Sequence, residues 1–162
     1  GDLYQWGRLA DGHEKRNSPT TTTLSPTDVP GHGDFIVNNS ESDDWRTSPN
    51  NNLWQGENGI NNPCPSGFRL PTAVELEQEI NTWTSQDAAG AFSSPLKLVM
   101  GGVRSPLDGS LGLEGLAGYC WSSTVDGAYS RILGYQDRGS GDHVFITCTV
   151  RGEGFGVRCI KN

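Results

Sequence analysis

The sequence has little of what several common protein classes require. No apolar run approaches the roughly 18–20 residues that cross a bilayer, so no membrane span is expected. Basic residues are few: 12 Lys and Arg against 19 Asp and Glu give a net charge of −7. Without a basic cluster the chain lacks the surface on which nucleic-acid binding depends. Hydrophobic residues make up only 33% of the chain, too few for a bundle of Ala- and Leu-rich helices.

The usual catalytic motifs are also missing. The three histidines, His13, His32 and His143, are far apart and form no zinc-binding pattern such as HExxH. No two cysteines form a CxxC pair, and no Gly-x-Ser-x-Gly elbow is present. The Gly-rich segment 152–156 has the composition of a phosphate-binding loop, but it precedes an expected strand and offers no helix N-terminus. These absences disfavour an enzyme.

What the chain does have is 22 Gly, 9 Pro and a good supply of Trp, Phe and Tyr. Its 162 residues contain no repeat and no dividing linker, so we expect one domain over residues 1–162. The polar segment 11–62 is too long for an ordinary connection. Hydrophobic side chains punctuate it, and we interpret them as anchors of long loops: Phe35, Ile36, Trp45, Leu53, Trp54 and Ile60.

One helix is predicted over about residues 73–84. Thr72, followed three residues later by Glu75, forms a capping box at its start. Apolar residues then recur at helical spacing and predict one buried stripe: Ala73, Leu76, Ile80 and Trp83. A second short helical turn is expected at 88–92.

The other elements are predicted to be short strands. Alternation is cleanest at 143–150, where Val144, Ile146, Cys148 and Val150 share one face. Further strands are expected at 3–8, 96–100, 119–123, 128–135 and 155–159. One main helix with several short strands and long loops predicts an α+β fold.

Four cysteines occur at positions 64, 120, 148 and 159. An even number without metal-ligand spacing favours structural disulfides in a secreted protein, and three connectivities are possible. The alternative is four free thiols in a cytosolic protein. The sequence opens at Gly1 without a signal-peptide pattern, so we expect a domain excised from a larger secreted protein.

Three motifs in order carry a family resemblance: PCPSGFRLPT at 63–72, YCWSST at 119–124 and GFGVRCIK at 154–161. YQWGR at 4–8 and GHEKRN at 12–17 fit the same pattern, so the resemblance covers nearly the whole chain. Together they resemble the Fibrobacter succinogenes major paralogous domain, a family of bacterial surface and secreted modules. The resemblance implies a C-type-lectin-like fold in which the first and last strands pair and the termini lie close together. It also implies a disulfide between Cys64 and Cys159, leaving Cys120 and Cys148 to form a second.

Modules of this kind in large bacterial adhesins are similar to Ca²⁺-dependent binders of glycans or peptide termini. The resemblance therefore implies a cell-adhesion module on the bacterial surface that binds a peptide or glycan ligand as a monomeric bead. A related fold occurs in formylglycine-generating oxidases, whose Arg-Leu-Pro-Thr helix entry is matched at 69–72, so an enzyme is one alternative. A structural spacer is another. Arg69 and Arg158 belong to the family motifs and are expected to form internal ion pairs.

The expected binding site is the Gly-rich loop 136–143 and its neighbours. Asp137 and Asp142 lie five residues apart and could bind one Ca²⁺ together. The excess of acidic over basic residues favours this cation as a ligand. Carboxylates of neighbouring loops could complete the shell: Asp108, Glu114 and Asp126. The ordinary alternative is a solvated hairpin turn. Arginines near this loop could bind a ligand carboxylate through paired hydrogen bonds, and Tyr135 could stack on the ligand. The residues expected to contact the ligand are Tyr135, Asp137, Arg138, Asp142, His143, Arg151 and Glu153.

Overall fold

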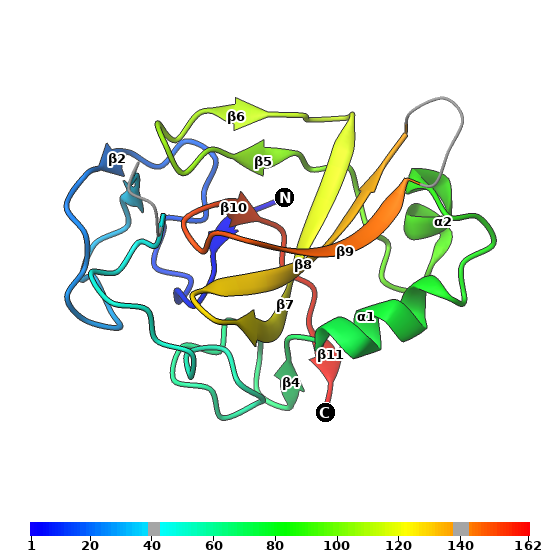
Figure 1. Ribbon diagram of the computed structural model, residues 1–162, viewed down its shortest axis with the longest axis horizontal. Helices are drawn as coiled ribbons and strands as arrows, with labels where there is room; N and C mark the ends of the chain where they lie inside the picture. The colour runs from blue at the N-terminus through cyan, green and yellow to red at the C-terminus, as the bar shows by residue number, and fades with distance from the viewer. Residues whose placement is uncertain (39–42, 138–142) are drawn as a thin grey trace.

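A computed structural model describes residues 1–38, 43–137 and 143–162. Within them the chain is mixed α+β, with two short helices and mostly short strands (Figure 1). The helices are α1 (Ala73–Ile80) and α2 (Ala88–Ser93). The strands are β1 (Tyr4–Gln5), β2 (Thr20–Thr21), β3 (Phe35–Ile36), β4 (Phe68–Arg69), β5 (Val103–Arg104), β6 (Leu111–Gly112), β7 (Ala117–Asp126), β8 (Tyr129–Gln136), β9 (Val144–Thr149), β10 (Gly154–Phe155) and β11 (Ile160–Lys161).

The antiparallel sheet β7-β8-β9 forms the centre of the molecule. Helix α1 packs against it through Leu76, which joins Leu133 and Tyr135 of β8 in one buried cluster (Figure 1). A second sheet has the strand order β1-β10-β5-β6, and its hairpin β5–β6 runs along the upper edge of Figure 1. Two strand pairs complete the fold: β4 with β11, and β2 with β3.

The predicted capping box of α1 is confirmed. The Thr72 hydroxyl accepts a hydrogen bond from the Glu75 N–H, while the Glu75 carboxylate accepts one from the Thr72 N–H at 2.8 Å. The helix ends at Ile80, earlier than the predicted 84. Thr82 explains the early end, because its hydroxyl and its backbone N–H both donate to the Glu79 carbonyl and tighten the last turn.

The long loops are pinned to the core by aromatic side chains. Four of the five tryptophans are fully buried. Each buried indole N–H donates to a backbone carbonyl of a distant segment, which satisfies the polar end of the ring. These bonds are Trp6 to Ser122, Trp45 to Trp6, Trp54 to Arg8 and Trp121 to Tyr4. Of the predicted anchors, only Ile60 is wrong, because it is largely exposed.

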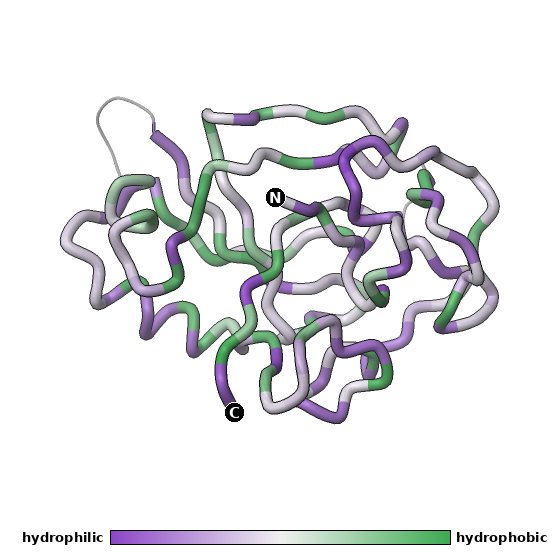
Figure 2. The backbone as a smooth tube through the Cα atoms, turned by 180° about the vertical axis from the view of Figure 1, so that it is seen from behind, coloured by the Kyte–Doolittle hydropathy of each residue, from purple (hydrophilic) through white to green (hydrophobic). Residues whose placement is uncertain are grey.

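Two strand predictions were wrong. Segment 96–100 is not a strand, because Lys97 has a φ of 49°, in the left-handed region that strands do not use. The expected last strand at 155–159 is divided into β10 and β11, which join different sheets. The first strand therefore pairs with β10, and the last strand pairs with β4. The two ends of the chain lie apart in Figures 1 and 2, contrary to the expected pairing of the termini.

One disulfide prediction is confirmed and the other is wrong. Cys64 and Cys159 are bonded, closing a sequence separation of 95 residues. Cys120 and Cys148 are free thiols, the first buried and the second exposed. Cys120 lies on β7 opposite Leu133, and Cys148 lies on β9 opposite Arg131, so β8 separates them. Two strand spacings amount to about 10 Å, beyond the roughly 7 Å that a disulfide can span between Cα atoms.

Candidate functional site: a pocket beside Arg158

The predicted ligand loop is only partly described. Asp137, which follows β8, is exposed, and His143, which precedes β9, is partly buried. The Gln136 N–H donates to the His143 carbonyl and closes the hairpin. Arg138 and Asp142 lie outside the described residues, so their predicted roles stay predictions.

Three other predicted contact residues lie in the interior. Tyr135 is buried and donates its hydroxyl to the Val99 carbonyl at 2.8 Å. Arg151 is 1% exposed, and its guanidinium lies 4.4 Å from the centroid of the Trp6 ring. Glu153 is mostly buried and accepts a hydrogen bond from the Thr149 hydroxyl. The structure therefore gives Arg151 an internal role in place of a surface clamp.

The four predicted metal ligands that the structure describes are not brought together. Asp108 accepts hydrogen bonds from Ser110 in the β5–β6 turn, and Glu114 forms an ion pair with Arg16. Asp126 ends β7 opposite Tyr129, the first residue of β8, whereas Asp137 follows the last residue of β8. The eight residues of β8 span about 23 Å, so these two carboxylates cannot share one cation.

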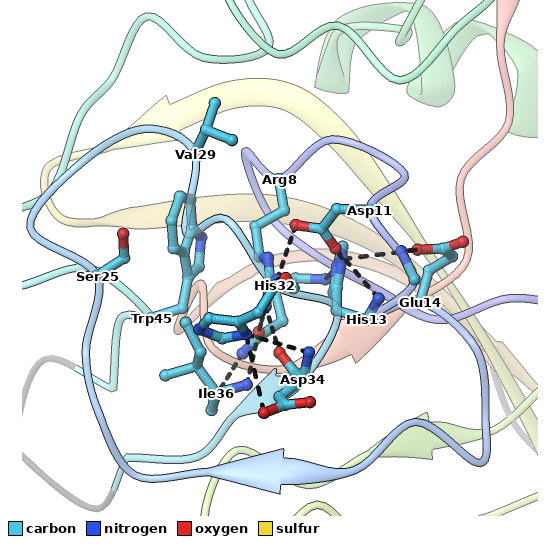
Figure 3. A network of polar contacts seen from close by, with 12 residues as sticks. Arg8, Asp11, His13, Glu14, Ser25, Val29, His32, Asp34, Ile36 and Trp45 are labelled. Atoms are coloured by element: carbon cyan, nitrogen blue, oxygen red, sulfur yellow. Dashed lines mark hydrogen bonds and ion pairs between the residues drawn. The ribbon is translucent and has the colours of Figure 1, made fainter.

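A cluster that the sequence did not suggest brings together the side chains of Asp11, His13 and Glu14 (Figure 3). The His13 Nε2 atom accepts a hydrogen bond from the Gln5 N–H, so Nδ1 carries the ring proton and donates to Asp11 at 2.7 Å. Both ring nitrogens are therefore in use. Burial alone would raise the pKa of Asp11, but hydrogen bonds from His13 and Arg8 lower it to about 2. The network holds the first loop in place, and it does not offer His13 as a free metal ligand.

Asp44 is a buried carboxylate near Arg151. Its side chain is 1% exposed, and one oxygen accepts the Arg46 N–H at 3.0 Å. Its other oxygen has no hydrogen-bond partner. Burial raises the pKa of Asp44 to about 6, although the Arg46 N–H and the charge of Arg151 act in the opposite direction.

Replacing Asp44 by Asn is expected to remove part of the pH dependence of stability. The folded pKa lies above the ordinary 3.8, so between about pH 4 and 6 the folded chain holds a proton that the unfolded chain has lost. The free energy of unfolding therefore falls as pH rises through this range, by an amount on the order of 2–3 kcal/mol from this group. Urea unfolding of both chains at pH 4.5 and pH 7 checks this. The prediction fails if Asp44→Asn stabilises the chain equally at both.

A pocket of the described chain lies elsewhere, between the chain's first residues, segment 98–102 and segment 156–158. Its volume is about 240 Å³. Buried side chains of Leu3, Leu98, Cys120 and Tyr135 line it, together with the partly exposed rings of Tyr4 and Tyr119. These residues come from four separate parts of the sequence, which is why no local pattern predicted the pocket.

Arg158 supplies positive charge to this pocket. Arg158 lines the pocket together with Cys120 and Tyr135. Burial raises the pKa of both groups, and the charge of Arg158 acts against that rise in each. The Arg158 guanidinium makes one hydrogen bond among the described residues, from Nη2 to the Lys97 carbonyl at 3.1 Å. The expected ion pair is thus found for Arg69, which binds Glu75, and is not found for Arg158 within the described chain.

The disulfide fixes the position of Arg158. Cys159, its chain neighbour, is bonded to Cys64, and β11 follows directly and pairs with β4. The Gly156 carbonyl accepts the Trp121 N–H, which ties the other side of the segment to β7. Arg158 therefore projects from a short segment held at both ends. The motif GFGVRC marked this segment in the sequence, but it did not show that the Arg faces a pocket.

Comparisons with family models, with curated proteins and with solved structures gave no match to this chain. Among the described residues, neither helix is long and apolar enough to span a bilayer.

Proposed function

We propose that this chain is an extracellular ligand-binding module and that the pocket beside Arg158 receives the ligand. The observation that carries the proposal is a guanidinium most of whose N–H donors have no partner in the described part of the chain, at a pocket of about 240 Å³ lined by tyrosines. Pockets with apolar walls and a few placed polar groups are the usual form of a binding site. The Cys64–Cys159 disulfide supports an oxidising, extracellular setting. Cell adhesion, as a module of a bacterial surface protein, is the setting that the sequence motifs favour.

The ligand that fits this chemistry carries a carboxylate and a small apolar group. Arginine binds carboxylates through two parallel N–H bonds, and Arg158 can offer such a pair. Leu98, Tyr119 and Tyr135 provide surface for an apolar side chain of about one residue. A peptide C-terminus has both features, whereas a neutral glycan has no group that requires Arg158. The proposal therefore favours a peptide terminus.

We propose Ca²⁺ binding separately from the pocket. The net charge of −7 and the exposed carboxylate of Asp137 support it. Since the other predicted ligands lie elsewhere, any site at this loop would depend on Asp137 and on residues outside the described chain.

An oxidase is the main alternative, and the two free thiols bear on it. Cys120 and Cys148 lie on different strands with β8 between them, so they are not placed to react as a pair. Burial raises the pKa of the Cys120 thiol to about 11, which disfavours the reactive thiolate. Both observations support a binding module over a thiol enzyme. A spacer, the third possibility, predicts no saturable ligand.

The test is a peptide array in which every peptide is printed with a free carboxylate and again as the C-terminal amide, alongside glycans. We expect binding to the carboxylate series only, and we run the array in Ca²⁺ and in chelator to separate the metal proposal. Arg158→Ala should weaken the best peptide roughly ten- to hundredfold, the effect of a lost charge-assisted hydrogen bond. Arg131→Ala is the matched control, because that exposed Arg pairs only with Asp126 among the described residues. Equal binding of amides and acids would refute the proposal.

A further inference from the structure

Strand β9 forms an open edge of the central sheet. The sheet order is β7-β8-β9, so β9 pairs with β8 on one side only among the described strands (Figure 1). The bond from the Gln136 N–H to the His143 carbonyl marks these two residues as a hydrogen-bonded pair. Such pairs alternate along an antiparallel ladder, so Phe145, Thr147 and Thr149 bond to β8. The N–H and C=O groups of Val144, Ile146 and Cys148 therefore point outward.

This edge has none of the usual protection. Natural edge strands carry Lys, Pro or a bulge that prevents pairing with another chain. The sequence of β9 is Val-Phe-Ile-Thr-Cys-Thr, without charge and without Pro, and its register with β8 runs without a break over six pairs. The net charge of the chain is −7, so most of its surface repels a second copy. Because β9 carries no charged side chain, a second copy that pairs along it meets no like charge there.

Apolar surface continues beside the edge. A groove of about 290 Å³ runs along β9 and is lined by Leu113, Tyr119, Ile132, Phe145 and Thr147, among others. Phe145 is 38% exposed, and its ring lies across Gly134, where a Cβ would meet it at 2.3 Å. Four leucines in the β5–β6 hairpin and directly after it are exposed as well: Leu107, Leu111, Leu113 and Leu116.

We propose that two copies of this chain pair through β9, antiparallel, to form one continuous six-stranded sheet. The outward groups fix the register, because Val144, Ile146 and Cys148 must form the hydrogen-bonded pairs. With the two-fold axis at Ile146, this residue faces Ile146 of the partner subunit, and Val144 faces Cys148 of the partner subunit. Three such pairs give roughly six backbone hydrogen bonds.

The side chains on both faces suit this register. Phe145 then lies opposite Thr147 of the partner subunit, an aromatic and β-branched pair of the kind that stabilises sheets. The other face brings Ile, Val and Cys together. Every cross-strand contact is uncharged, so the strand is complementary to itself. A partner protein of another kind would have to match this edge, whereas a second copy matches it by symmetry.

Backbone pairing can be separated from disulfide formation at a single position. Cys148→Pro removes one outward N–H without touching the ladder to β8, since its N–H faces away from that strand. Cys148→Ala keeps the N–H and removes the thiol. Sedimentation velocity of the whole chain without reductant, which leaves the Cys64–Cys159 disulfide intact, from about 1 to 500 µM, should show a concentration-dependent dimer for wild type and Cys148→Ala. Cys148→Pro should associate at least tenfold more weakly.

The other outcomes overturn the proposal. A wild-type chain that stays monomeric to 500 µM refutes it, and so does a Cys148→Pro chain that dimerises like wild type. Loss of the dimer in Cys148→Ala as well as in Cys148→Pro would mean a Cys148 disulfide in place of strand pairing. If Cys148→Pro does not fold, Thr147→Glu is the second variant, because it places a carboxylate against the Phe145 ring of the partner subunit and adds negative charge to a chain that already carries −7. A folded Thr147→Glu chain that still dimerises at wild-type strength rejects the edge.

Discussion

Removing the Cys64–Cys159 disulfide is expected to lower the free energy of unfolding by about 4–5 kcal/mol. The bond closes a separation of 95 residues, and the entropy that a cross-link removes from the unfolded chain grows with the length of the loop. Hydrophobic residues make up only 33% of the chain, so few other contributions can offset such a loss. The double variant Cys64→Ala/Cys159→Ala should therefore be largely unfolded at 37 °C, which urea unfolding and near-ultraviolet circular dichroism would show.

Cys148→Ala is the matched control. Its thiol is free and exposed, so the free energy of unfolding of the monomer should change by less than about 0.5 kcal/mol. A double variant that stays within about 1 kcal/mol of wild type would show that the core holds the fold without the disulfide.

Arg151→Ala is expected to cost about 3–5 kcal/mol of stability. The Arg151 guanidinium is buried over Trp6 and donates to the Ser130 hydroxyl and to the Asn51 side chain, the latter at 2.6 Å. It also reaches two carbonyls of the β7–β8 turn, those of Gly127 and Tyr129. Removing it leaves these acceptors without a donor and the nearby Asp44 charge uncompensated.

Thermal unfolding of Arg151→Ala beside Arg131→Ala checks this. Arg131 is 43% exposed and forms a 3.4 Å ion pair with Asp126, so its loss should change stability by less than about 1 kcal/mol. The sequence had suggested a ligand contact for Arg151. An Arg151→Ala chain with unchanged melting but weakened binding would restore that interpretation.

The features predictable from sequence were those whose cause lies within a few residues. The start of α1 followed from Thr72 and Glu75, which meet within one helical turn. Alternation at 143–150 predicted β9 to within a residue at either end. The free state of Cys120 and Cys148 could not be predicted in this way, because it depends on β8 lying between their strands. The short strand β10 pairs only with the distant strands β1 and β5, and its two residues carry no periodicity.

The dependence on distant segments also explains why the sequence did not reveal the site. The loop 136–143 stood out because Asp, Gly and Arg are close together in the sequence. The pocket is built from residues near positions 4, 98, 119, 135 and 158, which come together only after folding. Arg151 and Arg158 are both single arginines among short side chains, so composition did not distinguish them. Burial distinguishes the two arginines, since Arg151 is buried and Arg158 is partly exposed.

The most direct measurement of ligand binding is an amide NMR titration with N-acetyl-L-leucine, a carboxylate of about the size of the pocket, and with its amide, N-acetyl-L-leucinamide. If the pocket is the site, the acid should produce saturable shifts of the amides of Gly101, Gly156 and Val157, which line it. The amide, and the acid added to Arg158→Ala, should produce little. Saturable shifts centred on Asp137 and His143, or identical shifts with the acid and the amide, would contradict the assignment of the pocket.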